Sequence, residues 1–310
     1  MHISALTSAA GHPTLSGMPE LPEVEHVVRA LRRSVVRRRI LATEIRLPKL
    51  VPRNAQAAFN RKLKGSRICG VRRRGKFILI DLDKPKMLSH GRAVGTRPGS
   101  GSVLIFHLRM TGKFRYLTVD EELPRYAHAI FYLDNERRLV FCDQRQFGVM
   151  KLVAYSRLAH TKGIRELAPE PFSDEFSLDY LKRVLARSQR SLKTLLLDQT
   201  KVLGLGNIYA SEALFRAQIN PFKIATTLAP KRVARLHQAI REVLTDAMSD
   251  GTRLRVNLEH PDGFTYGEAF EDFWHVYDRE GEPCVRCGAR IRRETQGGRS
   301  TYWCPRCQRR

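Results

Sequence analysis

Four cysteines near the carboxyl end constrain the folding of this 310-residue chain more than any other feature. Cys284 and Cys287 form one C-x-x-C pair, Cys304 and Cys307 form a second, and 16 residues separate the pairs. Each C-x-x-C turn presents two thiolates on one side, so two turns complete a tetrahedron around one Zn²⁺ ion. Two redox pairs are the alternative, but no thioredoxin-like strand and helix pattern surrounds them. The spacing therefore predicts one structural zinc ion held by these four ligands.

The remaining composition indicates a reducing compartment and a polyanionic partner. Cys69 and Cys142 lie in apolar, strand-like segments, which predicts buried free thiols rather than a disulfide framework. Lysine and arginine total 55 against 31 acidic residues, a formal net charge of +24. An excess of this size in a foldable chain indicates a polyanion as partner. The sequence has no long apolar run and no separate basic amphipathic helix, so nucleic acid is favoured over a membrane.

The run PELPEVE, Pro19–Glu25, stands directly behind an internal methionine, Met18. Residues 1–17 carry no lysine or arginine and no compact apolar run, unlike a secretory signal or a mitochondrial presequence. If translation starts at Met18 and the methionine is removed, Pro19 becomes a free secondary amine beside the Glu20 carboxyl group. An α-amine with a pKa of about 7.7–8.0 is neutral roughly a hundred times more often at neutral pH than a lysine. The sequence thus predicts a nucleophile next to an acid, and a removed or non-native extension over 1–18.

The apolar pattern predicts strands in the first half of the chain and helices in the second. Val24, Val27, Val28, Leu31 and Val35 have helical spacing after Pro22, which suits a first helical turn. Alternating apolar segments predict strands over 39–45, 76–82, 103–108, 116–119, 129–133 and 139–142, with a hairpin turn at 134–136. Strands this closely spaced favour a β-sandwich or barrel over a βαβ sheet. The Gly-, Ser- and Pro-containing segment 84–102 predicts a long mobile loop.

Beyond the prolines of LAPEP at 167–171, helical spacing predicts three helices, over 178–185, 192–196 and 233–247. Leu203–Asn207 (LGLGN) separates the second of these, Leu192–Asp198, from another helical segment, Ile208–Ala217, and Asn207 is a candidate cap of that segment. Its glycines allow close backbone approach to an anion, which favours either a DNA phosphate clamp or an ordinary helix connection. A dinucleotide fingerprint is excluded, because Tyr209 replaces the third glycine and a helix precedes the motif.

Basic and apolar residues between the strands are candidates for contacts with DNA. Arg72–Arg74 predict a solvated basic strand edge or simple phosphate contacts, whereas Lys76 at the start of a strand is a candidate for a more specific role. Met110 and Phe147 would ordinarily be assigned to the core. On a DNA-binding surface they and Arg145 become wedge candidates that fill the gap left by an extruded base.

With these motifs in place, the chain resembles the formamidopyrimidine-DNA glycosylase family, bifunctional enzymes that remove oxidised purines from DNA. The resemblance runs from Met18 to the carboxyl end and rests on several motifs in the family order. They are PELPEVE, HLRMTG at His107–Gly112, Asp143–Gly148, LAPEP, LDQTKVLGLGNIYASEALF and the final cysteines. The related endonuclease VIII enzymes open differently, without the LPEVE continuation, so the purine-specific branch is favoured.

The resemblance implies an α+β multidomain fold with DNA held in a cleft between its parts. Residues 19–165 are expected to form a catalytic β-sandwich with flanking helices, 172–265 a helix–two-turn–helix domain, and 270–310 a four-cysteine zinc hairpin. The segment Arg255–Trp274 matches poorly, and the family carries there the loop that closes over the lesion. The segment 84–102 is expected to be an insertion.

The resemblance also implies roles for individual residues. Pro19 is similar to the Schiff-base nucleophile, Glu20 to the adjacent acid, Lys76 to the lysine assisting β-elimination, and Arg299 to the arginine associated with δ-elimination and phosphate binding. The positions implied to bind DNA are Met110, Arg145 and Phe147 at the vacated stack and the orphaned cytosine, Lys193 and Asn207 at phosphates, and His128. The family usually shows His-x-His where this chain has Tyr126-Ala127-His128.

The expected function is base-excision repair: excision of 8-oxoguanine and formamidopyrimidines from duplex DNA, then cleavage of the abasic site by β,δ-elimination. The expected partner is double-stranded DNA with oxidised purines or abasic sites, and the expected enzyme is a monomer with no membrane contact. Its expected location is the cytoplasm, with the nucleoid if the source is bacterial. Two alternatives are an endonuclease VIII-like glycosylase for oxidised pyrimidines and a non-catalytic DNA-binding protein whose Pro19 is blocked.

Overall fold

The structure is a computed structural model that describes residues 19–83, 86–87, 93–94, 101–249, 254–260, 265–266 and 274–309. The predicted extension 1–18 lies outside the described residues. So do most of the predicted loop 84–102 and most of the segment 255–274. Within them, short strand pairs are described, β4 (Lys86–Met87) with β5 (Ala93–Val94) and β11 (Leu254–Arg255) with β12 (Thr265–Tyr266).

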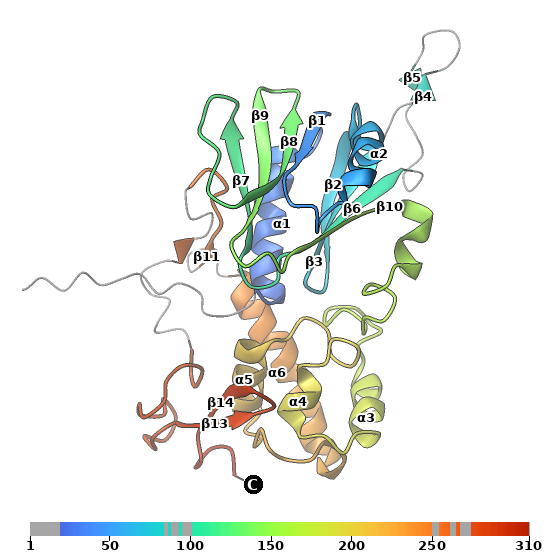
Figure 1. Cartoon of the computed structure of the whole chain (residues 1–310). Coiled ribbons are helices and arrows are strands. Elements are labelled where there is room, and N and C mark those ends of the chain that lie inside the picture. Colours follow the sequence, from blue (N-terminus) through green and yellow to red (C-terminus); the bar gives the residue numbers. More distant parts are fainter. Residues whose placement is uncertain are drawn as a thin grey trace, which may run out of the picture.

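Two four-stranded antiparallel sheets pack face to face in the upper half of Figure 1. One sheet has the order β1-β8-β9-β7, and the other has the order β10-β6-β3-β2. Phe106 of the second sheet meets Phe114, Phe131 and Phe141 of the first at ring-centroid distances of 4.9 to 6.2 Å. These rings are fully buried, and burying each stabilises the sandwich by about 1.5–3 kcal/mol. The predicted β-sandwich is confirmed. The strands are β1 (Ile40–Ile45), β2 (Arg67–Arg74), β3 (Phe77–Asp83), β6 (Ser102–His107), β7 (Gly112–Thr118), β8 (Ala127–Leu133), β9 (Arg137–Asp143) and β10 (Val149–Ala154).

Helix α1 (Leu21–Val35) connects the sandwich to the helices below it (Figure 1). Its apolar face, from Val24 to Val35, belongs to the sandwich core, whereas Leu21 is buried in the core of the helical half. The His26 ring bonds the carbonyl of Ala247 at 3.0 Å, near the end of the long helix α6. The spacing of apolar residues predicts this first helix, and the structure confirms it, with Pro22 in the first turn. The helix α2 (Arg53–Leu63), which packs on β1, was not predicted.

Within the described residues, the α-helices α3 to α6 and a small hairpin lie in the lower half of Figure 1. The carboxylate of Glu212 accepts hydrogen bonds from the backbone amides of His275, Val276 and Tyr277 at 2.9 to 3.0 Å, which fastens the hairpin module to the helices. This half completes the predicted α+β multidomain fold. Within the described residues, the helices are too short or too polar to cross a membrane. The elements are η1 (Tyr155–His160), α3 (Leu178–Ala186), α4 (Leu192–Leu196), α5 (Asn207–Arg216), η2 (Ala225–Thr227), α6 (Pro230–Ser249), β13 (Arg292–Gln296) and β14 (Arg299–Trp303).

Candidate active site

The carboxyl group of Glu20 lies at the amino end of α5. Its Oε1 accepts a hydrogen bond from the amide of Ile208 at 2.8 Å, and its Oε2 accepts from Gly206 at 2.5 Å and Tyr209 at 3.3 Å. The free amides and the dipole of a helix amino end favour an anion at this place. Glu20 is only 3% exposed, and burial raises the pKa of its carboxyl group despite these bonds and the nearby Lys76 charge. Pro19, the predicted nucleophile, is buried directly beside it.

Two glycines leave the space that Glu20 and its neighbour Leu21 occupy. A Cβ at Gly206 would stand 2.4 Å from Cδ of Glu20, and a Cβ at Gly204 would stand 2.4 Å from Cδ1 of Leu21. Gly204 also has φ +92°, which side chains of L-residues rarely adopt, and its carbonyl accepts from the amide of Leu21 at 3.1 Å. The two glycines of LGLGN therefore leave the space in which the amino end of α1 packs against this loop.

The structure bears on two predictions about this motif, and it corrects the second. The Glu20 carboxyl group of the same chain occupies the amides at the amino end of α5, which favours a connection between helices over a phosphate clamp at these amides. Gly206, not Asn207, is the N-cap of α5, and Asn207 is its first residue. The side chain of Asn207 instead donates to the carbonyl of Ser300 at 3.0 Å. Sequence alone gave no sign that an acid 186 residues upstream occupies the helix end.

Lys76 reaches the same region from the start of β3. Its ammonium donates to the carbonyl of Leu205 at 2.8 Å, and the residue is 7% exposed. Burial lowers the pKa of Lys76; attraction to Glu20 and Glu23 opposes this shift, and the charge of Arg299 adds to it. The predicted Glu20 and Lys76 are thus brought together with Arg299 in one electrostatic neighbourhood.

Glu23 and Tyr209 belong to this neighbourhood and were missed by the sequence reasoning. Glu23 accepts from the amide of Glu20 at 2.8 Å and from the Tyr209 hydroxyl at 2.7 Å. Burial first, and then the charge of Glu20, raise the pKa of Glu23 to about 7. The signal for Glu23 was the spacing Glu20-x-x-Glu23, which forms a capping box at the start of α1. Tyr209 carried no such signal.

Lys193 and Asn207 place the zinc hairpin against the helices. Lys193 is 1% exposed and donates to the Ser300 carbonyl at 2.7 Å and the Thr301 hydroxyl at 2.9 Å. Burial lowers the pKa of Lys193 to about 7. Because Lys193 and Asn207 both bond Ser300, they fix its neighbour Arg299, which is exposed and has no ion pair among the described residues. Direct phosphate contacts by Lys193 and Asn207 stay predictions.

Of the three wedge candidates on the sandwich, Arg145 contacts both of the others. The Arg145 guanidinium lies 4.9 Å from the Phe147 ring centroid and 3.4 Å from the sulfur of Met110. Phe147 is 48% exposed, an unusual exposure for a phenylalanine. His128, by contrast, is 8% exposed, and its Nε2 bonds the carbonyl of Asp143 at 2.8 Å. The structure therefore gives His128 a backbone partner, and its direct DNA contact stays a prediction.

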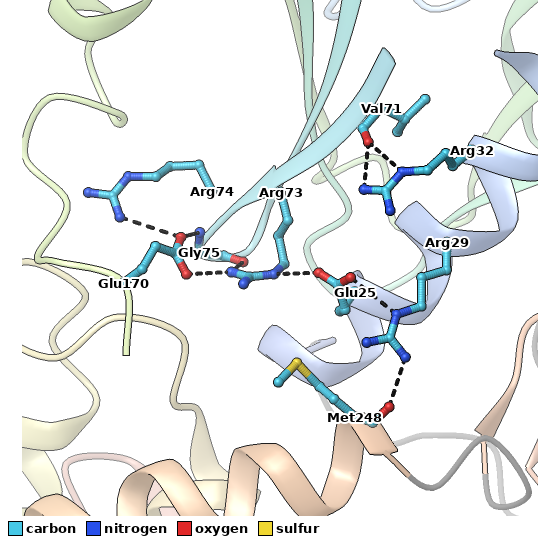
Figure 2. A network of polar contacts seen from close by, with 9 residues as sticks. All are labelled: Glu25, Arg29, Arg32, Val71, Arg73, Arg74, Gly75, Glu170 and Met248. Carbon is cyan, nitrogen blue, oxygen red and sulfur yellow. Dashed lines mark hydrogen bonds and ion pairs between the residues drawn. The ribbon is translucent and has the colours of Figure 1, made fainter. Parts of the chain in front are cut away.

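The arginine run of β2 is neither a solvated edge nor an open phosphate surface, which corrects the prediction for Arg72–Arg74. Arg72 pairs with Asp81 at 2.8 Å, and Arg73 and Arg74 pair with Glu170 at 2.8 and 3.4 Å. Figure 2 shows Arg73 between carboxylates of two different segments. Cys69, in the same strand, is exposed rather than buried, whereas Cys142 is buried as predicted.

The four predicted zinc ligands lie together. All four sulfur atoms are within 4.8 Å of one another, with 3.8 Å between Cys284 and Cys307 and 3.5 Å between Cys287 and Cys304. A tetrahedron with Zn–S bonds of about 2.3 Å has edges of about 3.8 Å. The set therefore fits one zinc ion with no open position, which is the geometry of a structural site.

Profiles of known families match the chain in three consecutive parts. The profile of the formamidopyrimidine-DNA glycosylase N-terminal domain matches residues 18–150, and that of the H2TH domain of the same enzyme matches 167–257. The chain belongs to the formamidopyrimidine-DNA glycosylase family. A profile of the zinc finger found in FPG and IleRS matches 281–310. Membership of this family makes the chain a base-excision repair glycosylase with one structural zinc ion.

Individual relatives and solved structures agree over nearly the whole chain. The formamidopyrimidine-DNA glycosylase of Pelotomaculum thermopropionicum is 42% identical over 293 residues, which cover 94% of this chain and 99% of the relative. The formamidopyrimidine-DNA glycosylase of Heliobacterium modesticaldum is 40% identical, and the match covers 94% of this chain and 100% of the relative. The Lactococcus lactis enzyme, in a crystal structure bound non-covalently to DNA with an abasic site, has a TM-score of 0.79 and 31% identity and covers the same shares, 94% and 100%.

Proposed function

We propose that the chain excises oxidised purines, 8-oxoguanine and formamidopyrimidines, from duplex DNA and then cleaves the abasic site by β,δ-elimination. The observation that carries this proposal is the buried Glu20 carboxyl group, held directly beside Pro19 by the amides of Gly206, Ile208 and Tyr209 at the amino end of α5. A proton donor and a nucleophile are thus fixed on adjacent residues. The Lactococcus lactis relative has been solved with abasic-site DNA, and a point mutant of it has been solved with Fapy-dG-containing DNA, which supports the substrate class.

The proposed first step is attack of the Pro19 amine on C1′ of the damaged nucleotide. The C1′–N bond to the base breaks, and the departing base takes up the proton that the Pro19 amine releases. Glu20 gives its proton to the sugar ring oxygen as the C1′–O4′ bond breaks, which leaves an iminium between Pro19 and C1′. The raised pKa of Glu20 suits this task, because the carboxyl group is protonated more often than an exposed one. The iminium then acidifies the C2′ proton, so that the C3′–O bond breaks. Lys76, which lies near Glu20, acts mainly in the departure of the damaged base and also assists this β-elimination, so Lys76→Ala should slow 8-oxoguanine excision more than cleavage of a preformed abasic site. Arg299 binds the phosphate that leaves in the second elimination.

The nucleophile requires a chain that begins at Pro19, and we propose that Met18 is the start and is removed. A proline inside a peptide bond has no free amine, so residues 1–18 would block the reaction. The family profile begins at residue 18. The relatives are matched over 99–100% of their own length by 94% of this chain, which supports the same start.

We also propose the arrangement on DNA. The exposed Phe147, with Met110 and Arg145 around it, fills the stack that the extruded base leaves and addresses the orphaned cytosine. Lys193 and Asn207 contact phosphates beside Arg299. His128 either contacts the DNA directly or supports the protein segment at Asp143 that faces the DNA. The proposed units are residues 19–165, 172–265 and 270–310, after an extension at 1–18. The proposed enzyme is a monomer of the cytoplasm, associated with the nucleoid if its source is bacterial.

A second substrate class has one observation in its favour. A Lactococcus lactis relative with 31% identity has been solved with DNA that contains an oxidised pyrimidine. Single-turnover excision from matched duplexes separates the two possibilities, one with 8-oxoguanine opposite cytosine and one with an oxidised pyrimidine. We expect faster excision of 8-oxoguanine. Much faster excision of the pyrimidine would instead assign an endonuclease VIII-like activity.

Removal of one zinc ligand is expected to abolish metal binding and most DNA binding. Cys287→Ser leaves three thiolates, so the hairpin loses the ion that closes it, and with it the fixed position of Arg299. Zinc content by atomic spectroscopy and duplex affinity by fluorescence anisotropy check this. Cys69→Ser, at the exposed free thiol, is the matched control and should keep both. Wild-type protein without zinc would contradict the four-cysteine site.

Duplex binding is expected to weaken steeply with salt. Lys76, Lys193, Asn207 and Arg299 are the proposed phosphate-binding side chains. Contacts with about three to six phosphates predict a log–log slope of affinity against salt of roughly −3 to −5, at about −0.9 for each neutralised phosphate. Anisotropy titrations between about 50 and 200 mM salt measure the slope. A flat response would rule out electrostatic DNA binding.

A further inference from the structure

The turn between β2 and β3, which carries Lys76, is held from outside the sandwich by Glu170. One carboxylate oxygen of Glu170 accepts from the backbone amide of Gly75 at 2.6 Å, and the other accepts from the Arg73 guanidinium at 2.8 Å (Figure 2). Glu170 lies in the LAPEP segment, which connects the sandwich to the helices. The residue immediately before Lys76 is thus bonded to the connection between the two halves.

Arg73 extends this contact to the first helix. Its Nε donates to Glu25 of α1 at 3.1 Å, while its Nη1 bonds Glu170 and the carbonyl of Gly75 at 3.1 Å. The Arg73 side chain is 11% exposed, and a charge so shielded from water needs its partners. Arg74 adds a bond to the carbonyl of Ala168 at 2.9 Å. Three segments therefore meet at the turn.

The turn also packs tightly on the loop that Lys76 contacts. Gly75 has φ +55°, and a Cβ there would stand 2.5 Å from Cδ1 of the buried Leu203. Two residues on, Leu205 provides the carbonyl that accepts from Lys76. A shift of the turn would therefore move the lysine relative to Glu20, and misplacement by about 1 Å can cost on the order of a hundredfold in rate.

We infer that Glu170 is a positioning residue for Lys76: through Gly75 and Arg73 it fixes the turn that presents the lysine to the reacting sugar. Glu170 itself touches no catalytic group in the described residues. The inference rests on the proposed role of Lys76. It predicts that removal of the Glu170 carboxylate lowers the rate only through the lysine.

The test is a double-mutant cycle with Glu170→Ala, Lys76→Ala and the combined variant. Single-turnover excision of 8-oxoguanine and cleavage of a preformed abasic site are measured for each. We expect Glu170→Ala to lower excision about 10- to 100-fold and abasic-site cleavage by less than about threefold. The combined variant should be no slower than Lys76→Ala, because the two residues act in one unit. Glu170→Gln keeps an acceptor for the Gly75 amide and should recover part of the rate.

Glu166→Ala is the matched control, since Glu166 precedes Glu170 on the same connection but, among the described residues, its side chain bonds Gly163 and Arg165 and does not contact the turn. It should leave both rates unchanged. Multiplied losses in the combined variant would overturn the inference, as would equal losses of both activities in Glu170→Gln, the variant least disturbing to folding. If Lys76→Ala does not distinguish the two substrates, the proposed role of Lys76 fails. Coupling in the cycle would then still link Glu170 to the lysine.

Discussion

Borohydride is expected to trap the chain that begins at Pro19 covalently on duplex DNA containing 8-oxoguanine opposite cytosine, and to trap none of the chain that retains residues 1–18. The reagent reduces an iminium to a stable amine, and only a free Pro19 amine can form that iminium at C1′. A denaturing gel with labelled DNA resolves the shifted complex. Intact-mass measurement of both proteins verifies their amino ends.

Pro19→Gly is the matched control for this trapping experiment. It keeps a primary α-amine of similar pKa and should retain weak trapping when the chain starts at residue 19. Equal trapping with the extension in place would show that a lysine is the nucleophile. Lys76 is then the first candidate, because burial lowers its pKa and so increases its neutral fraction. Lys76→Ala in the extended chain would identify it.

Glu20→Gln is expected to abolish base excision, with a loss on the order of 10²- to 10⁴-fold, while a preformed abasic site is still cleaved. The amide cannot deliver the proton that opens the sugar. Its NH₂ group must also face one of the backbone amides that now donate to the carboxylate. Abasic-site cleavage needs no departure of a base and is therefore affected less. Glu44→Gln, at an exposed carboxylate on β1, should change neither rate.

The pH profile of excision tests the same assignment. Glu20 acts in its protonated form, so its contribution is present below its raised pKa and is lost as pH rises through that value. The Pro19 amine acts in its neutral form, so its contribution falls as pH drops below about 7.7–8.0, the reference α-amine value. A bell-shaped profile is expected for wild type. Survival of the alkaline limb in Glu20→Gln would assign that limb to another group.

The sequence predicted the elements whose pattern is local. The strands over 103–108 and 129–133 alternate or run apolar because they face the shared core, and they appear at β6 and β8. The zinc ligands were predicted because their spacing alone determines the geometry. By contrast, β2 looked like a basic tract, since the acids that neutralise Arg73 lie 48 and 97 residues away in the chain.

The candidate site was predicted as a set of residues and not as an arrangement. Pro19, Glu20 and Lys76 came from motifs, but the partners of Glu20 are backbone amides, which no residue type reveals. In the sequence, Tyr209 served only to exclude a dinucleotide-binding motif. In the structure, its hydroxyl donates a hydrogen bond to Glu23. The partners of these side chains lie in segments far apart in the chain, and a local sequence pattern does not predict contacts between distant segments.

The position of Glu20 at the amino end of α5 has a consequence for a newly synthesised chain. The amine arises at the amino end as soon as the methionine is removed, whereas the amides that receive Glu20 lie near residue 206 and are made much later. An unfinished chain would carry the reactive amine without the acid held in place. Base excision would therefore wait until the sandwich and the helices have docked, and an incomplete chain would leave the bases of DNA in place.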